Sequence, residues 1–324
     1  MPMDQVPAPT AAQESDGPAQ QVVTELSQVR LCSVTWGPIG DDSRPLAVLL
    51  HGFPDTAHTW RHLGPTLAGA GYRVLAPFTR GYAPSGLAGD GVYHPAALMA
   101  DALALHTAHG GDERAVLIGH DWGAITANGI AAMPEQPFGS VVSLAVPPLT
   151  SLTPRPRDLI GLAPRQLALS WYTVFNQLPR LPEQQAERLI AHLWRRWSPG
   201  YDPTDDLALV AVSLPAGPHR SAAFGYYRDT VRRRRLPEAY AAAERAWLGA
   251  PRGRLLHLHG EQDGCCDVRW ARRAAPVLAA LDDADAQVRV IADGGHFLHL
   301  EQPEAVATEI LEFLDAAPSG EEER

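Results

Sequence analysis

Residues 115–129, AVLIGHDWGAITANG, place an aspartate where a strand would turn sharply into a helix. The apolar run 115–118 stops at Gly119, and the small and aliphatic residues that follow Gly123 are typical of a helix. A nucleophile framed in this way by small residues two positions before and after it indicates a nucleophile elbow, a turn that exposes its central side chain. Here that side chain is the carboxylate of Asp121.

A carboxylate at such a turn suits an attack on saturated carbon. A serine attacking sp³ carbon would form an ether, which a histidine-activated water could not readily cleave. A carboxylate forms an ester, and water can then attack its carbonyl carbon. Asp121 therefore predicts cleavage of carbon–oxygen or carbon–halogen bonds. An aspartate after a strand is often only a helix N-cap, but the two framing glycines favour the nucleophile.

Two later strands end in an acid and a base. The strand predicted at 254–260 runs toward Asp263, and the one predicted at 287–293 runs through two glycines to His296. Reactive groups collect at the carboxyl ends of parallel strands, so these side chains should meet Asp121. His296 would take a proton from water, and Asp263 would orient and polarise His296.

Two further side chains compete with these assignments, and two nearby histidines are interpreted as structural. Glu261 is the rival acid, and His299 is the rival base, although a packing role is expected for it. His51 and His120 are interpreted as structural histidines near the turns. Asp263 itself could be a turn residue before a glycine.

The elements that would position these residues follow an alternating pattern. Buried strands are predicted at 45–52, 72–77, 114–119, 140–146, 254–260 and 287–295, with an antiparallel edge strand at 29–37. Helices are predicted at 57–71, 94–110 and 125–133. Continuous apolar strands separated by helices predict a mostly parallel sheet covered on both faces, an α/β fold.

The pattern changes after the sixth core strand. Residues 149–250 hold many prolines, tryptophans and tyrosines and no clear buried strand, so they predict a helical lid inserted between two strands. The expected organisation is a disordered leader at 1–20, core at 21–148, lid at 149–250, core at 251–316 and a solvated tail at 317–324.

Composition limits the function classes. A net charge of −10 over 324 residues argues against a nucleic-acid binder, and no apolar run is long enough for a membrane span. The start lacks a secretory signal pattern, and three cysteines suggest reduced thiols in the cytoplasm. No metal-ligand spacing is seen, and no metal or cofactor is expected. A homodimer is left open.

Four segments together resemble the epoxide hydrolase family of the α/β-hydrolase superfamily, over about residues 25–315. They are HGFPD (51–55), GHDWG (119–123), the aspartate of GEQDG, and GGHFLHLEQP (294–303). Their order matches the nucleophile–acid–base order of that fold. The resemblance implies an oxyanion hole from the backbone N–H groups of Phe53 and Trp122. It also implies a pocket shaped by Phe53, Pro54, His120 and Trp122.

The same resemblance implies two tyrosines that protonate the opened epoxide oxygen. Tyr172 in WYTVFNQLP and Tyr227 in AFGYYRD occupy the matching places, with Tyr226 as the alternative if the register shifts by one. Phenols have a pKa near 10, so they stay protonated and can donate at neutral pH. The implied reaction adds water to an epoxide, gives a vicinal diol through an ester on Asp121, and needs no cofactor.

Two other functions remain open from the sequence. A haloalkane or haloacid dehalogenase would use the same aspartate, with Trp171, Trp194 or Trp197 as donors to the halide. Against it, Phe53 stands where haloalkane dehalogenases often have Asn, and Trp122 stands where haloacetate dehalogenases have Arg. A catalytically silent binding module would need a broken triad, and this triad is intact.

Overall fold

The core of the computed structural model is one eight-stranded sheet. The structure describes residues 19–152, 160, 162–232 and 235–316. The predicted leader, except for its last two residues, and the predicted tail lie outside the described residues. The sheet order is β1-β2-β4-β3-β5-β6-β7-β8. The strands are β1 (Gln20–Glu25), β2 (Arg30–Trp36), β3 (Leu46–Leu50), β4 (Arg73–Pro77), β5 (Val116–His120), β6 (Ser140–Leu144), β7 (Gly253–Gly260) and β8 (Ala284–Ile291).

The parallel part of the sheet is buried on both faces except at its edge strand β8, which is mostly half-buried. Strands β3 to β8 pair in parallel, and alternate residues enter two separate hydrophobic clusters. In β5, Val116 and Ile118 belong to one cluster, whereas Leu117 belongs to the other. This alternation follows from the two-residue period of a strand, and it confirms the predicted α/β fold.

The edge strand was predicted wrongly. Residues 30–36 do form an antiparallel strand, but β2 lies between β1 and β4 and is not the edge. The edge is β1, which begins at Gln20, a residue assigned to the leader. Its side chains are mostly exposed and polar, so the hydrophobic pattern that marks the buried strands is weak there.

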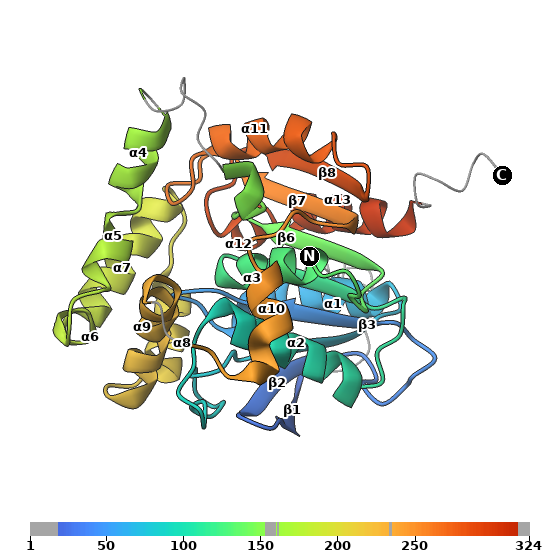
Figure 1. Cartoon of the computed structure of the whole chain (residues 1–324), viewed down its shortest axis with the longest axis horizontal. Coiled ribbons are helices and arrows are strands. Elements are labelled where there is room, and N and C mark those ends of the chain that lie inside the picture. The colour runs from blue at the N-terminus through green and yellow to red at the C-terminus, as the bar shows by residue number, and fades with distance from the viewer. Residues whose placement is uncertain (1–18, 153–159, 161, 233–234, 317–324) are drawn as a thin grey trace, which may run out of the picture.

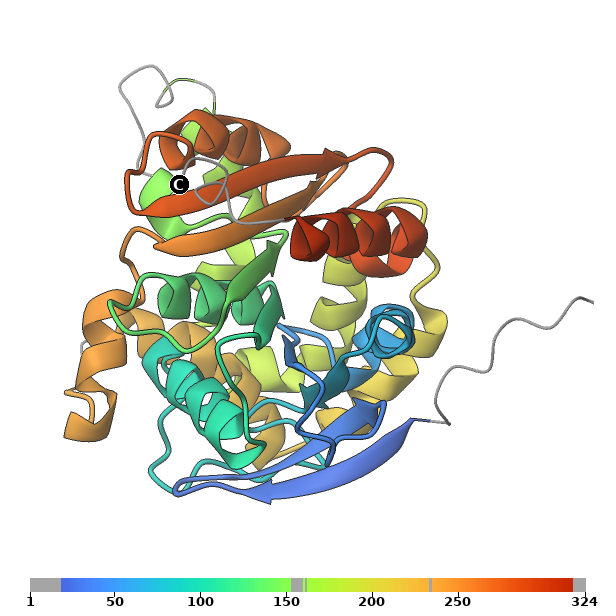
Figure 2. The ribbon, with the colours of Figure 1, turned by 90° about the vertical axis from the view of Figure 1, so that its right-hand side faces the viewer.

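Helices cover both faces of the sheet (Figure 1). Figure 2 shows α1 (Leu63–Gly69) and α13 (Pro303–Asp315) on one face, and α2 (Pro95–Ala108), α3 (Trp122–Ala131), α10 (Ala241–Ala246) and α11 (Val268–Leu278) on the other. The helix predicted at 57–71 is divided into a 3-10 turn, η1 (Ala57–Arg61), and α1. A short helix, α12 (Leu298–Glu301), precedes α13.

The helices between β6 and β7 stand beside the carboxyl ends of the strands (Figure 1). We call α4 to α9 the helical insertion. Its members are α4 (Leu162–Leu169), α5 (Trp171–Phe175), α6 (Leu181–Gln184), α7 (Ala186–Trp197), α8 (Thr204–Ser213) and α9 (Pro218–Val231). Two 3-10 turns, η2 (Leu149–Leu152) and η4 (Glu238–Tyr240), flank it, and α10 packs on α2 and α3 of the core. No helix in the described part of the chain is long and apolar enough to cross a membrane.

Candidate active site

Asp121 occupies a sharp turn between β5 and α3. Its φ of 52° lies in the left-handed region, which a residue with a side chain adopts only when its surroundings hold it there. A Cβ on Gly119 would lie 2.1 Å from the Gly123 carbonyl oxygen, and a Cβ on Gly123 would lie 2.0 Å from the Leu50 carbonyl oxygen. The two framing glycines are therefore required by close backbone approach, as the elbow motif predicts.

The three strand ends bring the predicted triad residues together. His296 Nδ1 lies 3.0 Å from Asp263 Oδ2, and His296 Nε2 lies 3.7 Å from Asp121 Oδ2. His296 is fully buried, and Asp121 is 5% exposed. The imidazole thus stands between the two carboxylates, in a position to exchange protons near Asp121.

Charge decides the protonation of His296. Burial lowers the pKa of the imidazole, but the Asp263 carboxylate, which is hydrogen-bonded to Nδ1, and the nearby Asp121 outweigh burial and raise the pKa to about 10. The two nearby acids therefore favour the protonated form of His296. Loss of the charge on Asp121 would lower the pKa and make the imidazole a better base.

Asp263 is held by the chain that follows it. Its Oδ1 accepts the N–H groups of Cys265 at 2.6 Å and Cys266 at 2.9 Å, which leaves Oδ2 for His296. The rival acid, Glu261, instead pairs with Arg272 at the surface at 3.0 Å.

One of the two predicted oxyanion donors makes its contact in this structure. The Phe53 N–H donates to Asp121 Oδ1 at 2.8 Å. Gly52 permits this approach, because a Cβ there would lie 2.4 Å from the same oxygen. The N–H of Trp122, at the first position of α3, stays a prediction. Oδ2 lacks this contact and faces His296 Nε2 at 3.7 Å.

The two predicted tyrosines lie together over the elbow. Their rings are 5.7 Å apart, and the Tyr227 ring contacts Trp122 at 5.0 Å. Burial raises the pKa of Tyr172 and Tyr227 well above 10, so both phenols are protonated. The Tyr172 hydroxyl lies 3.4 Å from Cys265 Sγ, whereas the Tyr227 hydroxyl has no hydrogen-bond partner among the described residues.

Tyr226 is engaged elsewhere. Its hydroxyl donates to the Arg80 carbonyl oxygen at 2.7 Å and lies 3.1 Å from Thr79 Oγ1. This hydroxyl bonds to the core and not to the cavity, so the structure does not support Tyr226 as the alternative to Tyr227. Tyr227 contacts Tyr172 and lines the cavity together with Asp121.

A cavity of about 600 Å³ lies between the helical insertion and the sheet. Asp121, Trp122, Tyr172 and Tyr227 line it, together with Cys265, Cys266, Gln166, Trp270 and aliphatic side chains. Asp121 is the only charged residue among the lining residues that the structure describes.

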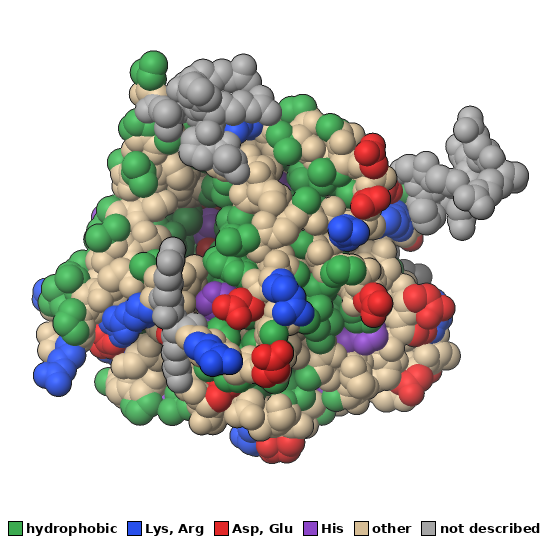
Figure 3. All heavy atoms as spheres, in the orientation of Figure 1, with side chains coloured by type: hydrophobic (Ala, Val, Ile, Leu, Met, Phe, Trp, Pro, Cys, Tyr) green, Lys and Arg blue, Asp and Glu red, His purple; other side chains and the backbone are tan. Residues whose placement is uncertain are grey.

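Hydrophobic side chains are also exposed on α4 to α6, on the outer side of the insertion at the left of Figure 3.

Three of the four residues predicted to shape the pocket lie behind it. Trp122 lines the cavity, but Phe53 and His120 are fully buried beneath it and Pro54 is not part of the lining. In the turn after β3, the Phe53 backbone N–H bonds to Asp121, and the Phe53 ring packs against the Tyr227 ring at 5.2 Å.

The tryptophans predicted as halide donors do not line the cavity. The Trp194 indole N–H donates to the Pro54 carbonyl oxygen at 2.8 Å, and Trp171 is 41% exposed on α5. Trp197 packs between the rings of Tyr172 and His296, at 5.0 and 4.8 Å. The dehalogenase alternative therefore loses the donors on which it depended.

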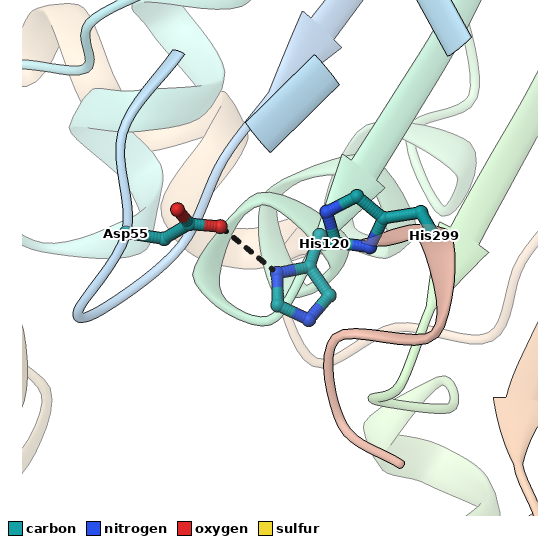
Figure 4. Close-up of side chains that lie close together, drawn as sticks. All are labelled: Asp55, His120 and His299. Atoms are coloured by element: carbon teal, nitrogen blue, oxygen red, sulfur yellow. Dashed lines mark ion pairs between the residues drawn. The ribbon is translucent and has the colours of Figure 1, made fainter. Parts of the chain in front are cut away.

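A second cluster of buried polar atoms lies beside the triad (Figure 4). Asp55, His120 and His299 present atoms within 4.8 Å of one another, and the closest approach drawn there is 3.9 Å, between Asp55 Oδ2 and His120 Nδ1. Burial raises the pKa of Asp55 to about 8 and lowers those of both histidines well below 6.5. Asp55 Oδ2, His120 Nδ1 and His299 Nδ1 have no hydrogen-bond partner among the described residues, and such oxygen and nitrogen atoms are of the kind that bind metal ions. His299 contacts Trp60 and Thr59 in this cluster, which favours its packing role over that of rival base.

Sequence reasoning did not find several residues of the cavity wall. Cys265, Cys266 and Trp270 come from the loop and helix after Asp263, and Gln166 comes from α4. The two cysteines could have been suspected, because they follow the acid directly. Gln166 carries no such signal in the sequence.

The comparisons agree with this architecture. The sequence profile of the α/β hydrolase fold family matches residues 45–303. Epoxide hydrolase A of Mycobacterium tuberculosis is 31% identical over 85% of this chain and 92% of its own length. Epoxide hydrolase 4 of Mus musculus is 27% identical over 85% of this chain and 74% of its own.

Solved structures support the same fold. Epoxide hydrolase A of Mycobacterium thermoresistibile superposes with a TM-score of 0.66 at 24% identity, covering 92% of this chain and 98% of that one. A provisionally assigned epoxide hydrolase of Klebsiella pneumoniae superposes with a TM-score of 0.73 at 23% identity, covering 92% and 97%. Since the profile spans most of the chain and a relative exceeds 30% identity over nearly its full length, this chain belongs to the epoxide hydrolase family of the α/β-hydrolases.

Proposed function

We propose that this protein hydrolyses epoxides to vicinal diols through a covalent ester on Asp121. The observation that carries the proposal is that the Asp121 carboxylate lies near two kinds of group that can transfer protons, the phenols of two tyrosines and the imidazole of a histidine. Asp121 shares the cavity with the phenols of Tyr172 and Tyr227 and faces His296 on its other side. The epoxide hydrolases among its relatives support the same reaction.

In the first half-reaction, Asp121 Oδ2 attacks an epoxide carbon and the carbon–oxygen bond of the ring breaks. Tyr172 or Tyr227 donates its proton to the departing oxygen, which becomes the first hydroxyl of the diol. The ester leaves Asp121 without charge, so the pKa of His296 falls from about 10. His296 then releases the proton that the free enzyme favours, and that proton returns to the tyrosinate through solvent.

In the second half-reaction, His296 takes a proton from water as that water attacks the ester carbonyl carbon. Negative charge then develops on Oδ1, where the Phe53 N–H already donates. The carbon–oxygen bond to the substrate stays intact and the acyl–oxygen bond breaks. The diol therefore leaves with an oxygen that began on Asp121. The proton of the new carboxyl group passes to that oxygen, which restores the Asp121 carboxylate, and His296 keeps the proton taken from water.

The cavity favours an uncharged, lipophilic epoxide. Its described lining contains no cation that could pair with a substrate carboxylate. Several of its polar side chains form hydrogen bonds with other protein groups. Gln166 and Gln177, for example, donate to the carbonyl oxygens of Cys265 and Tyr227.

We also propose a cytoplasmic location, which the three free, buried cysteines support. Light scattering would test whether the protein forms a homodimer.

A single turnover in heavy-oxygen water tests the mechanism. The first diol should carry ordinary oxygen, and the label should appear in the peptide that contains Asp121. Direct attack of water on the epoxide would instead put the label in the first diol, and that result would reject the ester.

A further inference from the structure

The end of α7 binds both catalytic loops at once. Trp197 and Ser198 close this helix of the insertion, and each is only 1% exposed. The Trp197 carbonyl oxygen accepts the N–H groups of Gly264 and His296, both at 3.0 Å. One carbonyl group of the insertion therefore joins the loop that carries Asp263 to the loop that carries His296.

Three consecutive backbone amides around the base are held in this way. The Gly295 N–H donates to Glu301 Oε2 at 3.0 Å, the His296 N–H donates to Trp197, and the Phe297 N–H donates to Ser198 Oγ at 3.1 Å. The Ser198 hydroxyl in turn donates to Glu301 Oε1 at 2.5 Å. Ser198 and Glu301 thus act as a pair. The hydrogen bond between their side chains orients Glu301 to accept the Gly295 N–H and Ser198 to accept the Phe297 N–H.

Both loops pack tightly against the end of α7 at two glycines. A Cβ on Gly264 would lie 2.1 Å from the Arg196 carbonyl oxygen, and a Cβ on Gly295 would lie 2.7 Å from Ser198 Cα. On the opposite side, His120 Nε2 donates to the His296 carbonyl oxygen at 2.9 Å. The main chain of the base is therefore held from the insertion and from the core together.

We propose that Ser198 and Glu301 are positioning residues for His296, and that they serve the ester-hydrolysis step. The inference rests on the proposed function. Ester formation uses Asp121 and the two phenols, none of which bonds to Ser198 or Glu301 in the described structure. Hydrolysis needs His296 Nε2 aimed at a water beside the ester, and an error of about 1 Å in such a position can cost about 100-fold in rate.

The test compares Ser198→Ala and Glu301→Gln with Ser213→Ala on one epoxide. Ser213 is also a buried serine, at 3% exposure, and it ends α8 in the same insertion without bonding to either catalytic loop. Slower hydrolysis after irreversible ester formation lowers kcat and KM by the same factor and leaves kcat/KM unchanged. We expect a fall of about 10- to 100-fold in both constants for Ser198→Ala. Glu301→Gln, which keeps the acceptor for Ser198 but places a donor opposite Gly295, should give a smaller fall.

Intact-mass spectrometry gives an independent readout, because the ester should accumulate in both variants during turnover but not in Ser213→Ala. A fall in kcat with KM unchanged and no accumulated ester would overturn the positioning role and leave only a structural one. If Ser198→Ala does not fold, Glu301→Gln alone decides between these outcomes. Absence of any ester in both the wild type and His296→Gln would instead reject the proposed function itself.

Discussion

The carboxyl edge of the sheet and the helical insertion supply different halves of this active site. The sheet edge carries Asp121, Asp263 and His296, each in the turn or loop that follows a strand. The insertion carries Tyr172 on α5 and Tyr227 on α9. In the proposed mechanism, the insertion supplies the acids for ester formation, and the sheet edge supplies the nucleophile and the base for ester hydrolysis.

The two regions hold their side chains by different means. Asp121 is held by backbone contacts so close that Gly119 cannot carry a Cβ. The tyrosines are held mainly by ring contacts, Tyr172 with Trp197 at 5.0 Å and Tyr227 with Trp122 at 5.0 Å. Backbone contacts tolerate little change, whereas ring contacts can adjust, so we expect changes at the sheet edge to have the larger effects.

Removing the base at the sheet edge should have the largest effect. His296→Gln should lower turnover by about 10⁴-fold, because the ester forms but no base activates the water. Mass spectrometry should show the protein–substrate ester within one turnover. His299→Gln serves as the control, since its ring packs on Trp60, and it should not accumulate ester. Failure of a folded His296→Gln to form the ester would remove the division between the two regions.

Removing both phenols should have the next largest effect, on the first step alone. Tyr172→Phe with Tyr227→Phe should slow ester formation by about 100-fold or more, the lower range of general acid assistance. Stopped-flow tryptophan fluorescence can follow this step, because Trp122 lies against Tyr227. Tyr226→Phe is the matched control, because its hydroxyl bonds to Arg80 and not to the cavity. Equal rates for the double variant and this control would exclude the phenols as acids.

A glycine change tests the rigidity of the sheet edge. Gly119→Ala should lower the free energy of unfolding by about 3 kcal/mol, the upper end for overpacking, because the atom that it meets belongs to the backbone. Gly40→Ala meets nothing within 4 Å and should change stability by less than about 0.5 kcal/mol. Urea unfolding of both variants measures the difference. Similar values would mean that the elbow relaxes easily.

The last prediction is a pH dependence of stability. The pKa of His296 is raised in the folded protein from an ordinary 6.5 to about 10, so its contribution is complete below pH 6.5 and is lost as pH rises toward 10. The free energy of unfolding of the wild type should therefore fall relative to that of His296→Gln across this range. A constant difference between the two would show that His296 is not an imidazolium in the free enzyme.

Much of this site follows from residues that are close in the sequence. The elbow, the acid after β7 and the base after β8 each belong to a short motif that follows a predicted strand, and the fold brings parallel strand ends to one edge. Asp121, Asp263 and His296 could be named for that reason. The edge strand β1 could not, because its exposed and polar side chains lack a buried pattern.

Tertiary structure alone decided what surrounds those residues. The sequence does not show that Phe53 and His120 lie behind the cavity, that Gln166 and Trp270 line it, or that Tyr226 turns its hydroxyl toward Arg80. These outcomes depend on how the helical insertion packs on the sheet, through contacts between residues far apart in the chain. Local motifs determined which groups carry the chemistry, because strand ends fix them, whereas long-range packing determined the cavity and the support around the base.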